Sequence, residues 1–150
     1  FLELGVGFSG ELSGRDNIYL YGSVLGLTKK QIDSWFDEIV SFAELEKFID
    51  LKMKNYSSGM FVRLAFSVAI RSDAPILLVD EVLAVGDVNF RQKCFNVFES
   101  HKREGKTVLL VSHDPDWIKR FCDRTVLIKS GRVSFCGDTG RAVDLYLSGE

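Results

Sequence analysis

Hydrophobic residues in the first half of the chain recur at the spacing of helices. Between positions 32 and 43, and again between 61 and 69, an apolar residue falls every three or four positions, which predicts two amphipathic helices. Ser13 and Asp16 have the spacing of a capping box and predict an earlier helix that runs through Leu25. The first half is therefore expected to be helical.

Cap and breaker residues set the limits of the other two helices. Thr28 and Gln31 repeat the capping-box spacing just before the 32–43 stripe. Ser57 and Ser58 are expected to cap the third helix, which ends at the Asp-Ala-Pro sequence of 73–75 because proline disfavours helix in the residue before it.

The second half alternates short apolar runs with helical segments. The runs Ile76–Val79 and Thr107–Val111 are continuously apolar and suit strands that are covered on both faces. A helix is expected between them, from about Val88 to Arg103, closed by Gly105. Strands that alternate with helices predict an α/β sheet, to which the helical first half is attached as a lobe. The expected division is a lobe at about 11–72 and an α/β part at about 73–150.

The last third predicts a helix, a hairpin and a closing helix. The helix covers about Pro115 to Cys122. Two strands, Thr125–Lys129 and Val133–Cys136, flank a turn at Ser130-Gly131, and the closing helix spans about Thr139 to Leu147.

Composition narrows the functional classes. The 150 residues are 46% hydrophobic and carry a net charge of -2, which gives no electrostatic reason to expect a nucleic-acid partner. The three cysteines lack C-x-x-C spacing, so reduced thiols are favoured over disulfides or a zinc site. No apolar run reaches the roughly 20 residues that a membrane span needs. Any membrane link is therefore expected to run through a partner protein and not through direct insertion.

Two glycine motifs match nucleotide-binding patterns only literally. Gly5-x-Gly7-x-x-Gly10 lacks the preceding strand and following helix of a dinucleotide site, so a glycine-rich loop is the better interpretation. Gly105-Lys106-Thr107 ends like a P-loop, but a helix precedes it and a strand follows, the reverse of the P-loop order. Position 105 is expected to be the glycine that ends a helix.

Three features carry candidate chemistry. Small and hydroxyl residues in Tyr56-Ser57-Ser58-Gly59-Met60 would let a helix start bind an anion, although an ordinary N-cap is the better interpretation of this segment taken alone. Asp80-Glu81 ends an apolar strand, where one carboxylate would hold Mg²⁺ and the other polarise a water; simple solvation is the alternative. His113 ends the next strand, where a structural role is the alternative.

Taken together, these features resemble the ATP-binding cassette (ABC) ATPases over nearly the whole chain. Residues 56–60 are similar to a variant of the family's signature loop, 76–81 to its Walker B strand with the catalytic glutamate, 84–87 to its D-loop and 112–114 to its switch histidine. The amino-acid sequences of residues 56–69, Asp80–Asp87 and the opening Leu2–Leu12 resemble those of the family branch that exports polysaccharide, O-antigen or teichoic acid. Val82 stands where most other branches have proline.

The resemblance implies a fold and a set of roles. The fold would be that of a P-loop NTPase-like ABC ATPase domain without its N-terminal part, with a helical signature lobe and a mainly parallel sheet. Asp80 would hold Mg²⁺ through water, Glu81 would be the general base and His113 would contact the γ-phosphate of ATP. The signature and D-loop residues would act on ATP held across a dimer, with Glu3 as a Q-loop equivalent; they are Ser57, Ser58, Gly59 and Asp87.

The same resemblance implies partners and a location. The whole protein would be an ATP-hydrolysing motor that dimerises and drives a membrane-spanning permease subunit. It would lie in the cytoplasm against the inner face of the cell membrane, and the helical lobe would meet the permease.

The chain opens at Phe1, inside an apolar stretch, so the N-terminal part of a longer protein is expected to be missing. The family's P-loop would lie there, so this polypeptide alone is expected to bind ATP weakly and to hydrolyse it negligibly. Three alternatives stay open: a non-transport ABC ATPase, a non-catalytic remnant or regulatory module, and a different cargo such as a drug or lipid.

Overall fold

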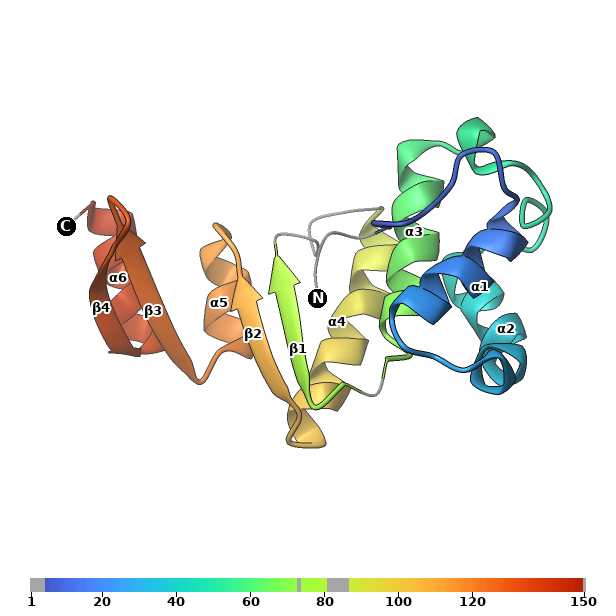
Figure 1. The fold of residues 1–150 in the computed structure, drawn as a ribbon. Coiled ribbons are helices and arrows are strands. Elements are labelled where there is room, and N and C mark those ends of the chain that lie inside the picture. The colour runs from blue at the N-terminus through green and yellow to red at the C-terminus, as the bar shows by residue number, and fades with distance from the viewer. Residues whose placement is uncertain (1–4, 73, 81–86, 150) are drawn as a thin grey trace.

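The computed structural model describes residues 5–72, 74–80 and 87–149 and has a helical part followed by an α/β part (Figure 1). The helical part contains α1 (Gly14–Val24), α2 (Lys29–Ala43), a single 3₁₀ turn (Met53–Asn55) and α3 (Ser58–Ala69). The α/β part follows in the order β1 (Ile76–Asp80), α4 (Val88–Arg103), β2 (Thr107–Val111), α5 (Pro115–Phe121), β3 (Arg124–Lys129), β4 (Arg132–Asp138) and α6 (Thr139–Ser148).

The helices begin where the cap residues predict. Ser13 accepts a hydrogen bond from the backbone of Asp16, and Thr28 accepts one from Gln31; the partner side chain returns to the cap backbone in both, so both capping boxes are confirmed. A feature that the periodicity missed is an isolated antiparallel bridge between Ser13 and Lys52, which ties the start of α1 to the segment before α3.

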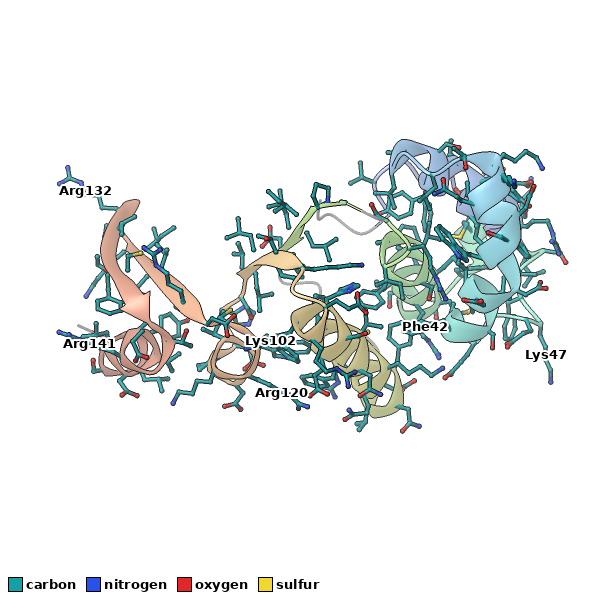
Figure 2. All side chains as sticks on the ribbon, turned by 90° about the horizontal axis from the view of Figure 1, so that it is seen from below. Phe42, Lys47, Lys102, Arg120, Arg132 and Arg141 are labelled. Carbon is teal, nitrogen blue, oxygen red and sulfur yellow. The ribbon has the colours of Figure 1, made fainter. Side chains whose placement is uncertain are left out.

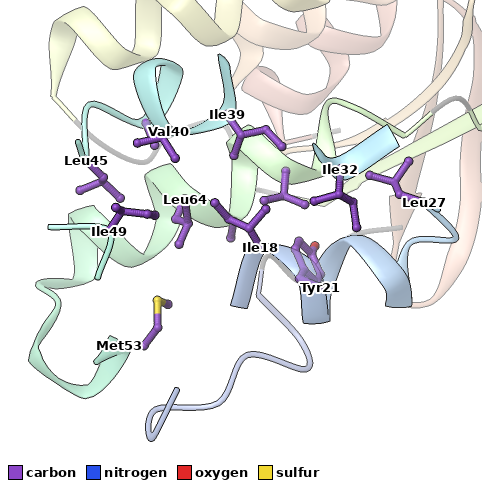
Figure 3. Close-up of a cluster of buried hydrophobic side chains, with 13 residues drawn as sticks. Ile18, Tyr21, Leu27, Ile32, Ile39, Val40, Leu45, Ile49, Met53 and Leu64 are labelled. Carbon is purple, nitrogen blue, oxygen red and sulfur yellow. The ribbon is translucent and has the colours of Figure 1, made fainter. Parts of the chain in front are cut away.

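One hydrophobic cluster holds the helical part together. Ile18 of α1, Ile32 and Ile39 of α2 and Leu64 of α3 are fully buried against one another (Figure 3). The apolar stripes predicted for 32–43 and 61–69 therefore face a common core. Tyr21 lies in the same cluster, and burial raises the pKa of its hydroxyl.

β1 and β2 form a parallel pair, as predicted. Ile76 pairs with Thr107 at one end and Asp80 pairs with Val111 at the other, so the two strands end level with each other. Helices α4 and α5 cover one face of this pair (Figure 2). A second cluster fills that contact; its buried members are Phe66, Val79, Phe90, Cys94, Phe98 and Trp117.

The prediction that both faces of these strands are covered is wrong for the described residues. Alternate side chains point away from α4 and α5 and stay exposed: Leu78 by 42% and Leu109 by 58% of their surface. Because successive side chains on a strand point to opposite faces, one layer of helices can bury only half of each run. The continuous apolar sequence of both strands is nevertheless typical of strands that are buried on both faces.

The C-terminal elements form a separate two-stranded sheet with a helix. β3 and β4 pair antiparallel with a register shift between Leu127 and Ile128, and α6 packs against them. Ser130 and Gly131 both have positive φ in the turn, which matches the predicted hairpin. Among the helices of the described residues, none is both long and apolar enough to cross a bilayer.

The structure agrees with the interpretation of both glycine motifs as a loop and a helix end, and not as nucleotide-binding motifs. Gly5 and Gly7 have φ values of 81° and 98° and lie in a turn, not at the start of a helix. Gly105 has a φ of 71° directly after α4, so it is the glycine that ends that helix before β2 begins.

Candidate functional site

The predicted signature residues lie at the start of α3. Ser57 is the N-cap, and its Oγ accepts a hydrogen bond from the Met60 N–H at 3.2 Å. Ser57 and Ser58 are exposed. A Cβ added to Gly59 would meet only Ser57 Oγ, at 3.9 Å, so internal packing does not demand glycine there. The helix start presents small residues and open space, which suits the close approach of an anion.

Tyr56 anchors this helix start to the rest of the lobe. Its hydroxyl donates to the Phe48 carbonyl oxygen over 2.9 Å. Burial raises the pKa of that hydroxyl. The ring also closes over Gly14, which is buried at the first turn of α1.

The two strand ends bring the next predicted residues to one edge. Asp80 is the last residue of β1 and pairs with Val111, so His113 follows only two positions beyond the level of Asp80. Both side chains are exposed. After His113, Asp114 caps α5 by accepting from the Asp116 N–H at 2.9 Å. Parallel register therefore places an acidic and an imidazole side chain at neighbouring strand ends.

Asp87, the predicted D-loop aspartate, is the N-cap of α4. Its Oδ1 accepts from the Phe90 N–H at 2.9 Å, and that backbone hydrogen bond holds the pKa of the Asp87 carboxyl below its usual range. Arg63 of α3 lies 3.8 Å from the other carboxylate oxygen. The aspartate thus links α4 to the signature helix.

These pieces share one side of the molecule. In Figure 1 the carboxyl ends of β1 and β2 and the N-termini of α3, α4 and α5 all face the same way. Helix N-termini carry partial positive charge and free N–H groups, and ligands of open α/β sheets bind at the carboxyl ends of the strands. The arrangement suits a polyanion such as a nucleotide phosphate chain.

Two predicted site residues, Glu81 and Glu3, lie outside the described residues. Among the described residues, no group of three or more histidine, cysteine or acidic side chains is close enough to hold a metal ion by itself. Asp80 is a single carboxylate at the strand edge. One carboxylate fits the habit of Mg²⁺, which keeps several waters and takes other ligands from phosphates.

Sequence reasoning missed the residues that join the lobe to α4. Arg63 lies 2.8 Å from Glu44, and Lys93 lies 2.6 Å from the same carboxylate. No local motif marks these positions, because the partners are far apart in the chain. The only available signal was the arginine that follows the signature residues on α3.

Comparison with known proteins finds relatives whose names all refer to ATP-binding or ABC transporter proteins. The chain is 45% identical over 145 residues to the O-antigen export system ATP-binding protein RfbB of Klebsiella pneumoniae, covering 97% of this chain and 59% of that protein. It is 46% identical to the ABC transporter protein AbcA of Aeromonas salmonicida, covering 97% of this chain and 47% of that protein. It is 42% identical to the teichoic acids export ATP-binding protein TagH of Levilactobacillus brevis, covering 97% of this chain and 40% of that protein. No protein-family model matches the chain.

The chain spans about half the length of these curated relatives. Solved structures agree on the fold. An ATP binding subunit of an ABC transporter superposes with a TM-score of 0.78 at 20% identity, covering 95% of this chain and 58% of that one. A dimeric ATP-binding cassette bound to ADP and Pi superposes with a TM-score of 0.71 at 23% identity, covering 91% of this chain and 61% of that one. The chain is thus a relative of the ATP-binding proteins of O-antigen and teichoic acid export, with the fold of part of an ABC ATPase domain.

Proposed function

We propose that the whole protein is the ATP-hydrolysing motor subunit of an exporter of polysaccharide, O-antigen or teichoic acid, and that this chain carries part of its ATPase domain. The supporting observation is the register of β1 and β2, which sets Asp80 level with Val111 and so brings His113 to the same edge. The names of the relatives support export of a cell-surface glycan.

Each site residue has a role in this proposal. Asp80 would hold Mg²⁺ through water, and the ion would neutralise charge on the phosphates. Glu81 would accept the proton of the attacking water, and His113 would contact the γ-phosphate. The phosphates would face the helix N-termini on the same side. In this proposal the chain's own carboxylates and imidazole orient water and phosphate.

Ser57, Ser58 and Gly59 would act on the ATP of a second subunit. The exposure of Ser57 and Ser58 at the start of α3 supports this role, because exposed side chains at an open helix start are available to a partner. Asp87 would lie at the same seam. The protein would therefore work as a dimer that closes on two ATP molecules, consistent with the dimeric cassette among its structural neighbours.

The helical lobe would meet the permease at the cytoplasmic face of the membrane. Exposed apolar side chains on this lobe support the assignment, with Val24 at the end of α1 exposed by 61% and Val6 by 47%. The two segments are neighbours, because a Cβ added to Gly7 would lie 3.6 Å from a methyl group of Val24. Exposed apolar side chains that lie side by side are available for contact with a partner protein.

Exchange of Glu81 for glutamine tests the catalytic assignment. In the intact ATP-binding protein, Glu81→Gln should lower the rate of phosphate release by about 100-fold or more, because a positioned general base contributes that much. Binding of ATP, followed with a fluorescent analogue, should be retained. Glu46→Gln is the matched control, since Glu46 is exposed on the lobe. Retained hydrolysis in Glu81→Gln would remove that residue from its role.

Mixed dimers test whether the site is shared between subunits. If Glu81 of one subunit works with Gly59 of the other, a dimer of Glu81→Gln and Gly59→Asp subunits keeps one working site. A dimer of the double variant and the wild type then keeps none. If each site lies within one subunit, the two outcomes are exchanged.

A further inference from the structure

Four charged residues form a junction cluster between the lobe and α4: Glu44, Arg63, Asp87 and Lys93. Glu44, the C-cap of α2, accepts hydrogen bonds from Arg63 Nη1 at 2.8 Å and from Lys93 Nζ at 2.6 Å. Arg63 Nη2 lies 3.8 Å from Asp87 Oδ2. The Lys93 hydrogen bond is the main cause that holds the pKa of Glu44 below its usual range. Arg63 thus lies between two carboxylates, and Lys93 joins one of them, so that the cluster connects three helices.

Aromatic rings support the cations of this cluster. The Arg63 guanidinium lies 5.8 Å from the centre of the Phe90 ring, and the Lys93 ammonium lies 5.6 Å from that of Phe42. Phe42, Phe66 and Phe90 pack against one another, with ring centres 5.7 to 6.1 Å apart. Phe42 lies at this junction of lobe and α4 in Figure 2. The Arg63 side chain is only 21% exposed, so its pairs are less screened by water than those on the open surface.

The cluster lies between the two halves of the candidate site. Arg63 sits on α3 within two turns of Ser57, so the start of α3 moves with it as a rigid unit. Asp87 caps α4 and follows Asp80 and Glu81 in the chain. Arg63, hydrogen-bonded to Glu44 and 3.8 Å from the Asp87 carboxylate, therefore links the helix start that would contact one ATP to the segment that would act on another.

We propose that Arg63 is a positioning residue for ATP hydrolysis, acting with Glu44 to hold the start of α3 in register with the N-cap of α4. This inference rests on the proposed function. Its physical basis is that a misplacement of about 1 Å in a catalytic arrangement can cost about 100-fold in rate. Nucleotide binding by one subunit should depend on it less than turnover does, because the fork spans the two halves of the site.

Steady-state hydrolysis by the intact ATP-binding protein tests the proposal. Arg63→Gln should lower kcat by about 10- to 100-fold and change KM for ATP by no more than about threefold. Arg15→Gln is the matched control, because Arg15 also binds a carboxylate, that of Asp50, at 2.7 Å but entirely within the lobe. That control should stay within about twofold of the wild type.

Further variants separate positioning from simple loss of structure. Glu44→Gln removes the carboxylate that both cations share, so it should reproduce the kcat loss. The pair Glu44→Gln with Arg63→Gln should lose no more than the larger single loss, because both remove one link. Arg63→Lys keeps the charge but not the fork, so it should recover kcat only in part. If Arg63→Gln fails to fold, Glu44→Gln decides the question.

The outcomes distinguish this inference from the function on which it rests. A wild-type protein without ATPase activity would overturn the proposed function. An active wild type whose Arg63→Gln variant, or Glu44→Gln in its place, keeps kcat within about twofold would overturn the positioning role alone. A kcat loss matched by the Arg15→Gln control would also overturn it, since any broken ion pair would then suffice.

Discussion

Replacing Gly14 with alanine probes the contact that anchors the signature helix start. Gly14 is the first residue of α1, and an added Cβ would overlap the Tyr56 hydroxyl and lie 3.0 Å from both Tyr56 Cζ and the Ile49 carbonyl oxygen. The tyrosine ring must then move. Its hydroxyl would lose the 2.9 Å hydrogen bond to Phe48.

The expected cost follows from three contributions. Loss of the Tyr56 hydrogen bond costs about 1 kcal/mol, and overpacking at a buried site costs about 1–3 kcal/mol. Alanine offsets about 0.5–1 kcal/mol of this cost because it lowers the conformational entropy of the unfolded chain. We therefore expect Gly14→Ala to lower the free energy of unfolding by about 1–3.5 kcal/mol.

A double-mutant cycle with Tyr56→Phe identifies the cause. Phenylalanine removes the oxygen that the new methyl group would overlap, so Gly14→Ala should cost about 1 kcal/mol less in that background. Urea unfolding followed by tryptophan fluorescence is the assay, since Trp35 packs against the lobe cluster. An equal cost of Gly14→Ala in both backgrounds would refute the argument that the hydroxyl is the obstacle.

Three further predictions concern the surface and the thiols. The isolated 150-residue polypeptide should bind the dye ANS, and Leu109→Lys should weaken that binding, because Leu109 lies on the exposed apolar face of the β1–β2 sheet. Burial raises the pKa of the Cys94 thiol to about 12, so at pH 8 a disulfide reagent should modify the exposed Cys136 and leave Cys94 intact in the folded protein. Val24→Asp in the intact exporter should impair transport while ATP hydrolysis persists, measured as glycan export beside phosphate release.

Features set by short stretches of sequence could be predicted. The helix α4 was expected at about Val88 to Arg103 and has those limits, because an N-cap aspartate and a terminal glycine are local signals. β2 likewise has the predicted limits. The edge that brings Asp80 and His113 together was predictable for a related reason, since parallel strands joined by a helix end at the same side.

Features set by distant partners could not be predicted. The apolar runs of β1 and β2 indicate strands covered twice, but a run of hydrophobic residues does not say which segment supplies each cover. The bridge between Ser13 and Lys52 and the pairing of Glu44 with Lys93 join residues far apart in the chain. Charged residues at such positions read as ordinary solvated side chains until the fold brings them together.

The junction cluster helps to explain how two hydrophobic clusters can together position one functional site. The lobe cluster around Leu64 and the sheet cluster around Phe98 bury largely different apolar residues, so few side chains join the two. Phe66, on the same helix as Leu64, belongs to the sheet cluster and ties α3 to it, while Arg63 adds directional bonds on the adjoining surface. Apolar contact tolerates sliding, whereas the charged hydrogen bond from Arg63 to Glu44 is directional. Alignment of α3 with the strand edge therefore rests on the Phe66 contact together with a few polar atoms, and the contribution of the polar atoms should appear in turnover more than in stability.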